Sequence, residues 1–273
     1  MNTRGLIHRS ALRPGLACLA VALLLAACQP AAPASPTPPA AETAAPAEPT
    51  STAESEPAPA LSLDLSGAAE ECTLETLPAS EGLAESPWRG PLPEHRAITL
   101  QGYPVTGHKM QAQIFIYPLE DYHAVSEAAA QAAGDLQTLL ESGAAPADLP
   151  FLPPMNARQV MRAGFMELDF QNGRGVRYLT WYSQGPGRIN NAEMFYTFQG
   201  ITADGAYYVS AILPVTHPDL PASPEVFAED EGQLADYPAY LVETVAFLDA
   251  QPGASFTPDL TALDALIQSL GVR

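Results

Sequence analysis

The sequence predicts an α+β fold, an antiparallel sheet of about six strands with helices packed on it, arranged as an α/β sandwich. Two observations lead to this prediction. Asn172-Gly173 and Asp204-Gly205 each lie between two apolar runs, which is the strongest short-range signal for a β-hairpin. Other segments repeat apolar residues at every third or fourth position, the spacing of an amphipathic helix.

Four strands are expected around the two hairpin turns, because apolar side chains there occupy every second position. These strands span residues 160–170, 176–183, 192–202 and 206–213, and they predict one antiparallel meander. An earlier pair of strands is expected over residues 97–103 and 110–117.

Three helices are expected. The first spans residues 119–142, between the two groups of strands, and the second spans residues 236–249. The third begins at Thr257-Pro258, where Thr would be the N-cap and Pro the first helical residue, and it ends at Gly271.

The N-terminal residues 1–27 have the character of a secretory signal peptide. Arginines without any acid precede an apolar run over residues 16–26, which is too short to cross a hydrocarbon layer of about 30 Å as a helix. The run ends in Leu25-Ala26-Ala27-Cys28, which resembles the lipobox of bacterial lipoproteins. The resemblance implies cleavage before Cys28 and lipid on its thiol; the alternative is a plain secretory peptide in which Cys28 is incidental.

Residues 28–60 are expected to form the lipidated Cys28 and a disordered Pro/Ala-rich stalk. Residues 29–60 contain nine Pro and no Leu, Ile, Val, aromatic or basic residue, so they cannot bury enough apolar surface to fold. Residues 61–273 are expected to form a single globular α+β domain. Its stretch 175–215 is similar to uncharacterised bacterial envelope lipoproteins, and its element order looks like the PsbP-like fold.

Charge and targeting together predict a function class. The chain has 31 acidic and 12 basic residues, which argues against a nucleic-acid partner because no basic surplus is present. We expect a lipid-anchored extracytoplasmic binding or accessory module on the outer side of a bacterial membrane. The membrane is its partner through the lipid at Cys28, and a small-molecule or protein ligand is unidentified. No cofactor is expected. The alternative is an envelope hydrolase with an unrecognised active site.

A ligand-binding surface is expected near the later strands, whose aromatic residues lie on both strand faces. One face would line a groove, and the loop over residues 184–191 would add polar groups that orient a ligand. The candidate ligand-binding residues are Trp181, Arg188, Asn190, Asn191 and Tyr208. In the alternative interpretation, helices cover both faces and the rings are core.

No catalytic residue is predicted. Ser183 lacks the leading Gly of a G-x-S-x-G nucleophile elbow, and His217 has no recognisable partner in the sequence. Cys72 has no intramolecular disulfide partner once Cys28 carries lipid, and we expect a small buried residue there, with pairing between chains as the alternative.

No metal site is predicted. Glu120, His123 and Glu127 have a spacing that could place them on one helical face, but a solvated face is the simpler interpretation. Glu229, Asp230, Glu231 and Asp236 lie in a Pro-rich connection without EF-hand spacing, which indicates a solvated loop rather than a calcium site.

Overall fold

The computed structural model describes residues 60–65, 67–82, 87–143, 148–227 and 234–273. The predicted signal peptide, Cys28 and all of the predicted stalk except Ala60 lie outside the described residues. The acidic residues 229–231 also lie outside them.

The main feature of the fold is a seven-stranded antiparallel sheet with strand order β2-β3-β4-β8-β7-β6-β5. Its strands are β2 (Glu71–Leu77), β3 (His95–Gln101), β4 (Gln113–Pro118), β5 (Arg158–Phe170), β6 (Gly173–Ser183), β7 (Phe195–Thr202) and β8 (Tyr207–Pro214). A second sheet pairs β1 (Leu61–Ser62) with β9 (Gly271–Val272). The α+β class is therefore confirmed, but about six strands was an underestimate, because β1, β2 and β9 carry no hairpin signal or long apolar alternation.

The four-strand meander is confirmed, since β5, β6, β7 and β8 are neighbours in that order. Gly175 on β6 lies directly opposite Gly200 on β7. A Cβ atom on either glycine would come within 2.6 Å of the Phe198 ring. The two glycines therefore make room for an aromatic ring that lies across the strands.

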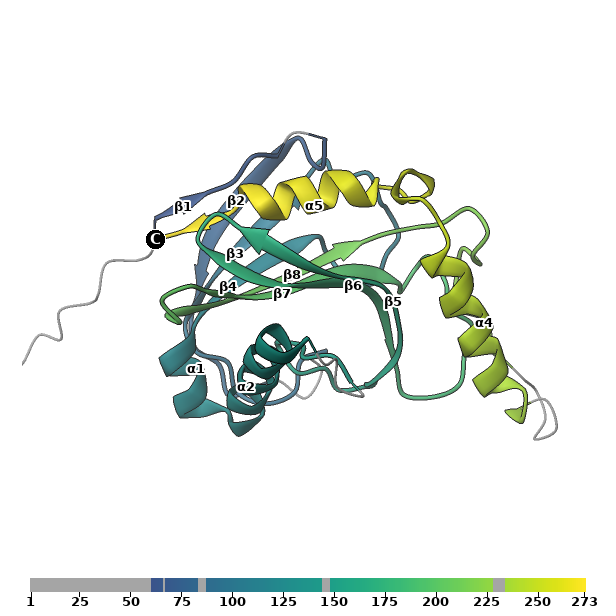
Figure 1. Ribbon diagram of the computed structural model, residues 1–273, viewed down its shortest axis with the longest axis horizontal. Coiled ribbons are helices and arrows are strands. Elements are labelled where there is room, and N and C mark those ends of the chain that lie inside the picture. Colours follow the sequence, from purple (N-terminus) through teal and green to yellow (C-terminus); the bar gives the residue numbers. More distant parts are fainter. Residues whose placement is uncertain (1–59, 66, 83–86, 144–147, 228–233) are drawn as a thin grey trace, which may run out of the picture. The chain divides into compact units, whose positions relative to one another are not determined.

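Helices cover both faces of the main sheet (Figure 1). They are α1 (Leu119–Val125), α2 (Glu127–Ser142), α4 (Tyr237–Asp249) and α5 (Leu260–Ser269), with a 3₁₀ turn η1 at Gly253–Ser255. Adjacent residues on β6 show the division between the two faces. Leu179 packs in the cluster that includes Leu263 of α5, whereas Tyr178 packs in the cluster that includes Leu136 of α2. Burial on both faces explains why the later strands are aromatic on both sides.

Two helix boundaries differ from the sequence prediction. The single helix expected over 119–142 is interrupted at Ser126, which has extended backbone angles (φ −144°, ψ 109°) and whose hydroxyl accepts a hydrogen bond from the amide of Ala129 at 3.2 Å. Ser126 thus caps a new helix. The last helix is capped by Asp259, not by Thr257, because Thr257 pairs with Thr216 in an extended bridge.

The outer strands of the main sheet are β2 and β5. Cys72 lies on β2 and is exposed, so the expectation of a buried thiol was wrong. The reason is that β2 pairs on one side only and most of its side chains face solvent.

The small β1–β9 sheet brings the first described residues beside the C-terminus. Ala60 and Arg273 exchange backbone hydrogen bonds, and the Asn172 side chain accepts from the Val272 amide at 2.9 Å. In Figure 1 the C-terminus and β1 lie at one end of the view and α4 lies at the other. Among the described helices, none is both long and apolar enough to cross a membrane.

Candidate functional site

The loop over residues 184–191, predicted to contact a ligand, packs on the N-terminal half of α4. The amide of Ile189 donates to the hydroxyl of Tyr240 at 2.8 Å. The guanidinium carbon of Arg188 lies 5.6 Å from the ring centres of both Phe227 and Tyr240, and its Nε is 3.8 Å from a carboxylate oxygen of Glu225. Arg188 therefore holds the loop against Tyr240 of the helix through a cation–π contact and against Glu225, which precedes the helix, through an ionic contact.

The other predicted residues of this group have partners inside the fold. Trp181 and Asn190 are buried and both donate to Glu193. The Asn191 side chain donates to the carbonyl of His217 at 3.0 Å and accepts from the His217 amide at 2.9 Å.

Tyr208 lies on the opposite face of the sheet from Trp181. It is fully buried, and its hydroxyl donates to the side-chain oxygen of Gln199 at 2.9 Å. The five predicted residues are therefore divided between two cores and a loop, and the structure does not bring them to one cavity.

A groove does run beside that loop, between β5 and α4. It consists of two adjoining cavities of about 380 and 490 Å³ that share Gln159, Val160 and Leu241. We define this edge groove by its floor, residues 158–162 of β5, and its wall, Leu241, Val242, Val245 and Ala246 of α4. Residues 184–186 of the predicted loop border the first cavity, so the sequence indicated one end of the groove.

The floor of the edge groove is the outer side of the last strand of the main sheet. Because β5 pairs only with β6 in the main sheet, alternate residues direct backbone N–H and C=O groups away from the sheet. The amide of Gly164 donates to a carboxylate oxygen of Asp249 at 2.5 Å, which ties the C-terminal end of α4 to the strand. The helix is thus held alongside the strand edge.

The wall of the edge groove is an apolar helix that the fold leaves half uncovered. In the sequence YPAYLVETVAFLD of α4, Leu248 is the single buried residue. Val242 is 70% exposed, and Leu241 and Val245 are half-buried. Leu241 and Val245 also pack against the core cluster that contains Leu248, so Val242 is the large apolar side chain that the fold leaves exposed on this wall. Sequence periodicity missed this feature, because an apolar residue gives no sign of whether it faces core or water.

Comparison of this chain with protein-family profiles, curated proteins and solved structures finds no match.

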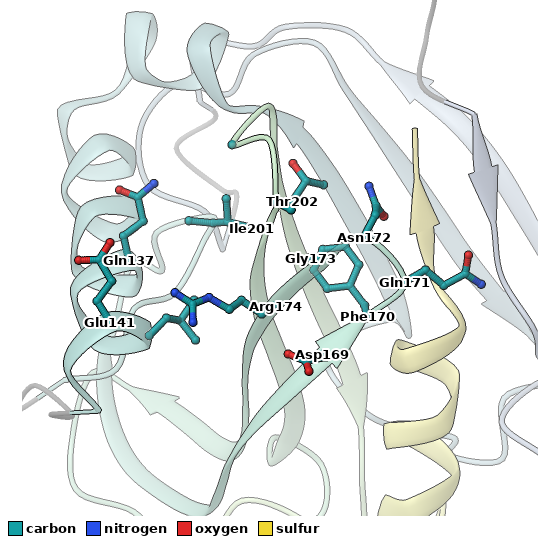
Figure 2. A pocket seen from close by; sticks show the side chains of 13 residues that line it. Gln137, Glu141, Asp169, Phe170, Gln171, Asn172, Gly173, Arg174, Ile201 and Thr202 are labelled. Carbon is teal, nitrogen blue, oxygen red and sulfur yellow. The ribbon is translucent and has the colours of Figure 1, made fainter.

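A larger cavity of about 710 Å³ lies between α2 and the tips of the two hairpins (Figure 2). We call it the hairpin cavity. Arg174 extends from β6 toward α2, from which Gln137 and Glu141 project, and Asp169 lies on the β5 side. Asn172 and Gln171, on the rim, already bond to the C-terminal residues.

The hydroxyl, imidazole and carboxylate groups singled out in the sequence do not assemble into a catalytic or metal site in the described part of the chain. The Ser183 hydroxyl donates to the carbonyl of Gly185 at 2.7 Å. The His217 ring is buried between Phe247 and Phe256, with centroid distances of 5.2 and 5.0 Å. Within the described ranges, no three His, Cys, Asp or Glu side chains lie close enough to hold a metal ion.

Glu120 and His123 lie on α1, whereas Glu127 begins α2 beyond the interruption at Ser126. The single helical face on which these three residues could have met is therefore not formed.

Proposed function

We propose that this protein is a lipid-anchored extracytoplasmic binding module of the bacterial cell envelope, and that it holds an extended segment of a partner polypeptide in the edge groove. The anchoring part of the proposal rests on the lipobox resemblance at Leu25-Ala26-Ala27-Cys28. The binding part rests on the groove between β5 and α4.

An extended polypeptide suits the two surfaces of the groove. A strand added beside β5 would form backbone hydrogen bonds along the outer side of this strand, which pairs only with β6 in the main sheet. Since side chains alternate along a strand, every second side chain of the added segment would face Leu241, Val242 and Val245 of the wall. A compact ligand could not form a continuous series of backbone hydrogen bonds along β5.

The length of the bound segment is limited by irregularities in β5. The register of β5 against β6 shifts between Gln159 and Met161 and again between Ala163 and Met166. Regular pairing on the outer side is therefore confined to a short stretch. Between the two shifts the pairing is regular over Met161, Arg162 and Ala163, so we expect a bound core of about three residues, at roughly 3.3 Å per residue.

The charge of the chain selects among partners. Its 31 acidic and 12 basic residues give a net charge of −19, whereas the groove itself is lined by two acids, Asp148 and Asp249, and two arginines, Arg158 and Arg162. Long-range attraction therefore favours a basic partner and disfavours an acidic one. The expected segment alternates apolar residues with Lys or Arg.

The single observation that carries the binding proposal is the exposure of an apolar helix beside an open strand edge. In Figure 1, α4, which forms the wall of the edge groove, lies at the opposite end of the view from β1 and the C-terminus.

Selection of random heptapeptides on the full mature chain tests this function. Enriched peptides should contain alternating apolar residues and basic residues. They should bind the wild type and the Val125→Glu variant equally, because Val125 is exposed at 44% on α1 and lies outside the groove. Binding to Val242→Glu should weaken at least about tenfold. Failure to enrich any such peptide, or equal binding to Val242→Glu, would overturn the proposal.

Anchoring is tested separately by Cys28→Ala. The unlipidated variant should move from the membrane fraction to the soluble fraction, while a Cys72→Ala control should stay with the membrane. Unchanged detergent partitioning of Cys28→Ala would contradict the anchor.

A further inference from the structure

The hairpin cavity is lined by charged side chains of both signs, among them Asp169 and Arg174, which lie opposite each other on β5 and β6 but form no ion pair within 4.0 Å. Arg174, Glu141 and Asp169 are exposed and line it. The ion pairs within 4.0 Å in the described part of the chain do not include any of these three residues. Each charge is therefore available to a ligand.

The same cavity has an apolar inner surface. Leu140 from α2 and Ile201 from β7 line it on the α2 face of the sheet and are 8% and 6% exposed, whereas Phe170, at the edge of the cavity, packs in the cluster on the α5 face. Gln137, exposed on α2, adds an amide on the side toward which Arg174 extends (Figure 2). The cavity thus offers one cation, two anions, an amide and a hydrophobic floor.

We infer that the hairpin cavity binds a zwitterionic α-amino acid with an apolar side chain. The ligand carboxylate would accept two parallel hydrogen bonds from the planar guanidinium of Arg174. The ligand ammonium would lie against Glu141 or Asp169, and the side chain would cover Leu140 and Ile201.

The pattern of charge favours a zwitterion over singly charged ligands. An anion without an ammonium group would be attracted by Arg174 but repelled by Glu141 and Asp169. A cation without a carboxylate would be attracted by Glu141 and Asp169 but repelled by Arg174. A ligand that carries both groups on neighbouring atoms places its carboxylate beside Arg174 and its ammonium group beside Glu141 or Asp169.

Three probes of nearly the same size test this inference on the full mature chain by titration calorimetry. Leucine carries both charges, isopentylamine lacks the carboxylate, and 4-methylpentanoate lacks the ammonium group. Leucine should bind at least about tenfold more tightly than either analogue. Equal affinities for the three probes, or no heat from leucine at millimolar concentration, would overturn the inference.

Two variants locate the binding. Arg174→Gln should weaken leucine binding at least about tenfold, whereas Arg89→Gln, which removes an exposed arginine outside the cavity, should leave it unchanged. Unaltered affinity of Arg174→Gln would overturn the assignment to this cavity. Val242→Glu should also leave leucine affinity unchanged, so the outcome is independent of peptide binding in the edge groove.

Discussion

The indole nitrogen of Trp181 donates a hydrogen bond to a carboxylate oxygen of Glu193 at 3.2 Å. The side-chain amide of Asn190 donates to the same oxygen at 2.8 Å, and Lys109 contacts the other oxygen. Trp181 and Asn190, which the sequence predicted to contact a ligand, are thus joined by Glu193, which was not among the predicted residues. Glu193 secures the turn before β7 against the end of β6.

Glu193→Gln should destabilise the fold by about 1 to 2 kcal/mol at neutral pH, because a charged acceptor of two buried donors is lost. Burial acts to raise the pKa of Glu193, but hydrogen bonds from Asn190, Lys109 and Trp181 outweigh it and hold the pKa below its ordinary value of 4.5. The carboxylate therefore stabilises the fold fully above pH 4.5, and this contribution is lost as the pH falls through the folded-state pKa. Urea denaturation at pH 7 and pH 3 should show a difference between wild type and variant that shrinks at pH 3. A difference of the same size at both values would contradict the prediction.

Asp264→Asn should destabilise the fold by about 3 kcal/mol, because it leaves the buried guanidinium of Arg177 without its counterion. Arg177 Nε lies 3.1 Å from Asp264 Oδ1, and the hydroxyl of Tyr196 donates to the same oxygen at 2.9 Å. Asp219→Asn is the control, since that carboxylate is 70% exposed, and it should change stability by less than about 0.5 kcal/mol. Equal effects of the two variants in chemical denaturation would show that the Arg177–Asp264 pair does not hold α5 to the sheet.

The two sides of α4 should respond differently to truncation. Leu248 is 2% exposed, so Leu248→Ala should cost about 2 to 5 kcal/mol. Val242 is 70% exposed, so Val242→Ala should change the free energy of unfolding by less than about 0.5 kcal/mol. Denaturation followed by tryptophan fluorescence measures both. A large loss in Val242→Ala would mean that the exposed side of α4 supports the fold rather than a partner.

Gly200→Ala should destabilise the sheet by about 1 to 3 kcal/mol, because its Cβ would lie 2.5 Å from the Phe198 ring. Gly134 provides the matched control. It lies within α2, and a Cβ atom added there would meet no neighbouring atom within 4 Å, so Gly134→Ala should stabilise the fold by about 0.5 to 1 kcal/mol. Melting temperatures that move in the same direction for both variants would contradict this account.

Much of the fold could be predicted from the sequence because local signals and tertiary structure agree there. The Asn172-Gly173 and Asp204-Gly205 turns place four strands in the observed order. The signal failed at Ser126, where a capping side chain interrupts a continuous apolar stripe, and at β2, an edge strand with little apolar content. A side-chain hydrogen bond decides the structure at Ser126, and pairing on one side only decides it at β2. Hydrophobic periodicity carries no information about either interaction.

The candidate site could be predicted only at its border. The loop over residues 184–191 reaches the edge groove, but the groove forms only because α4 lies beside β5. That contact joins segments far apart in the sequence: Gly164 and Asp249, which are hydrogen-bonded, are separated by 85 residues. No local pattern encodes such a pairing. The lipid anchor, the hydrolase alternative and the resemblance to the PsbP-like fold stay predictions.

The hydrogen bonds between Ala60 and Arg273 have a practical consequence for engineering. Because these residues are adjacent, a short peptide could join them, and new ends could be opened at an exposed turn elsewhere in the body. A circular permutant of this kind could be inserted into a host protein as a cassette.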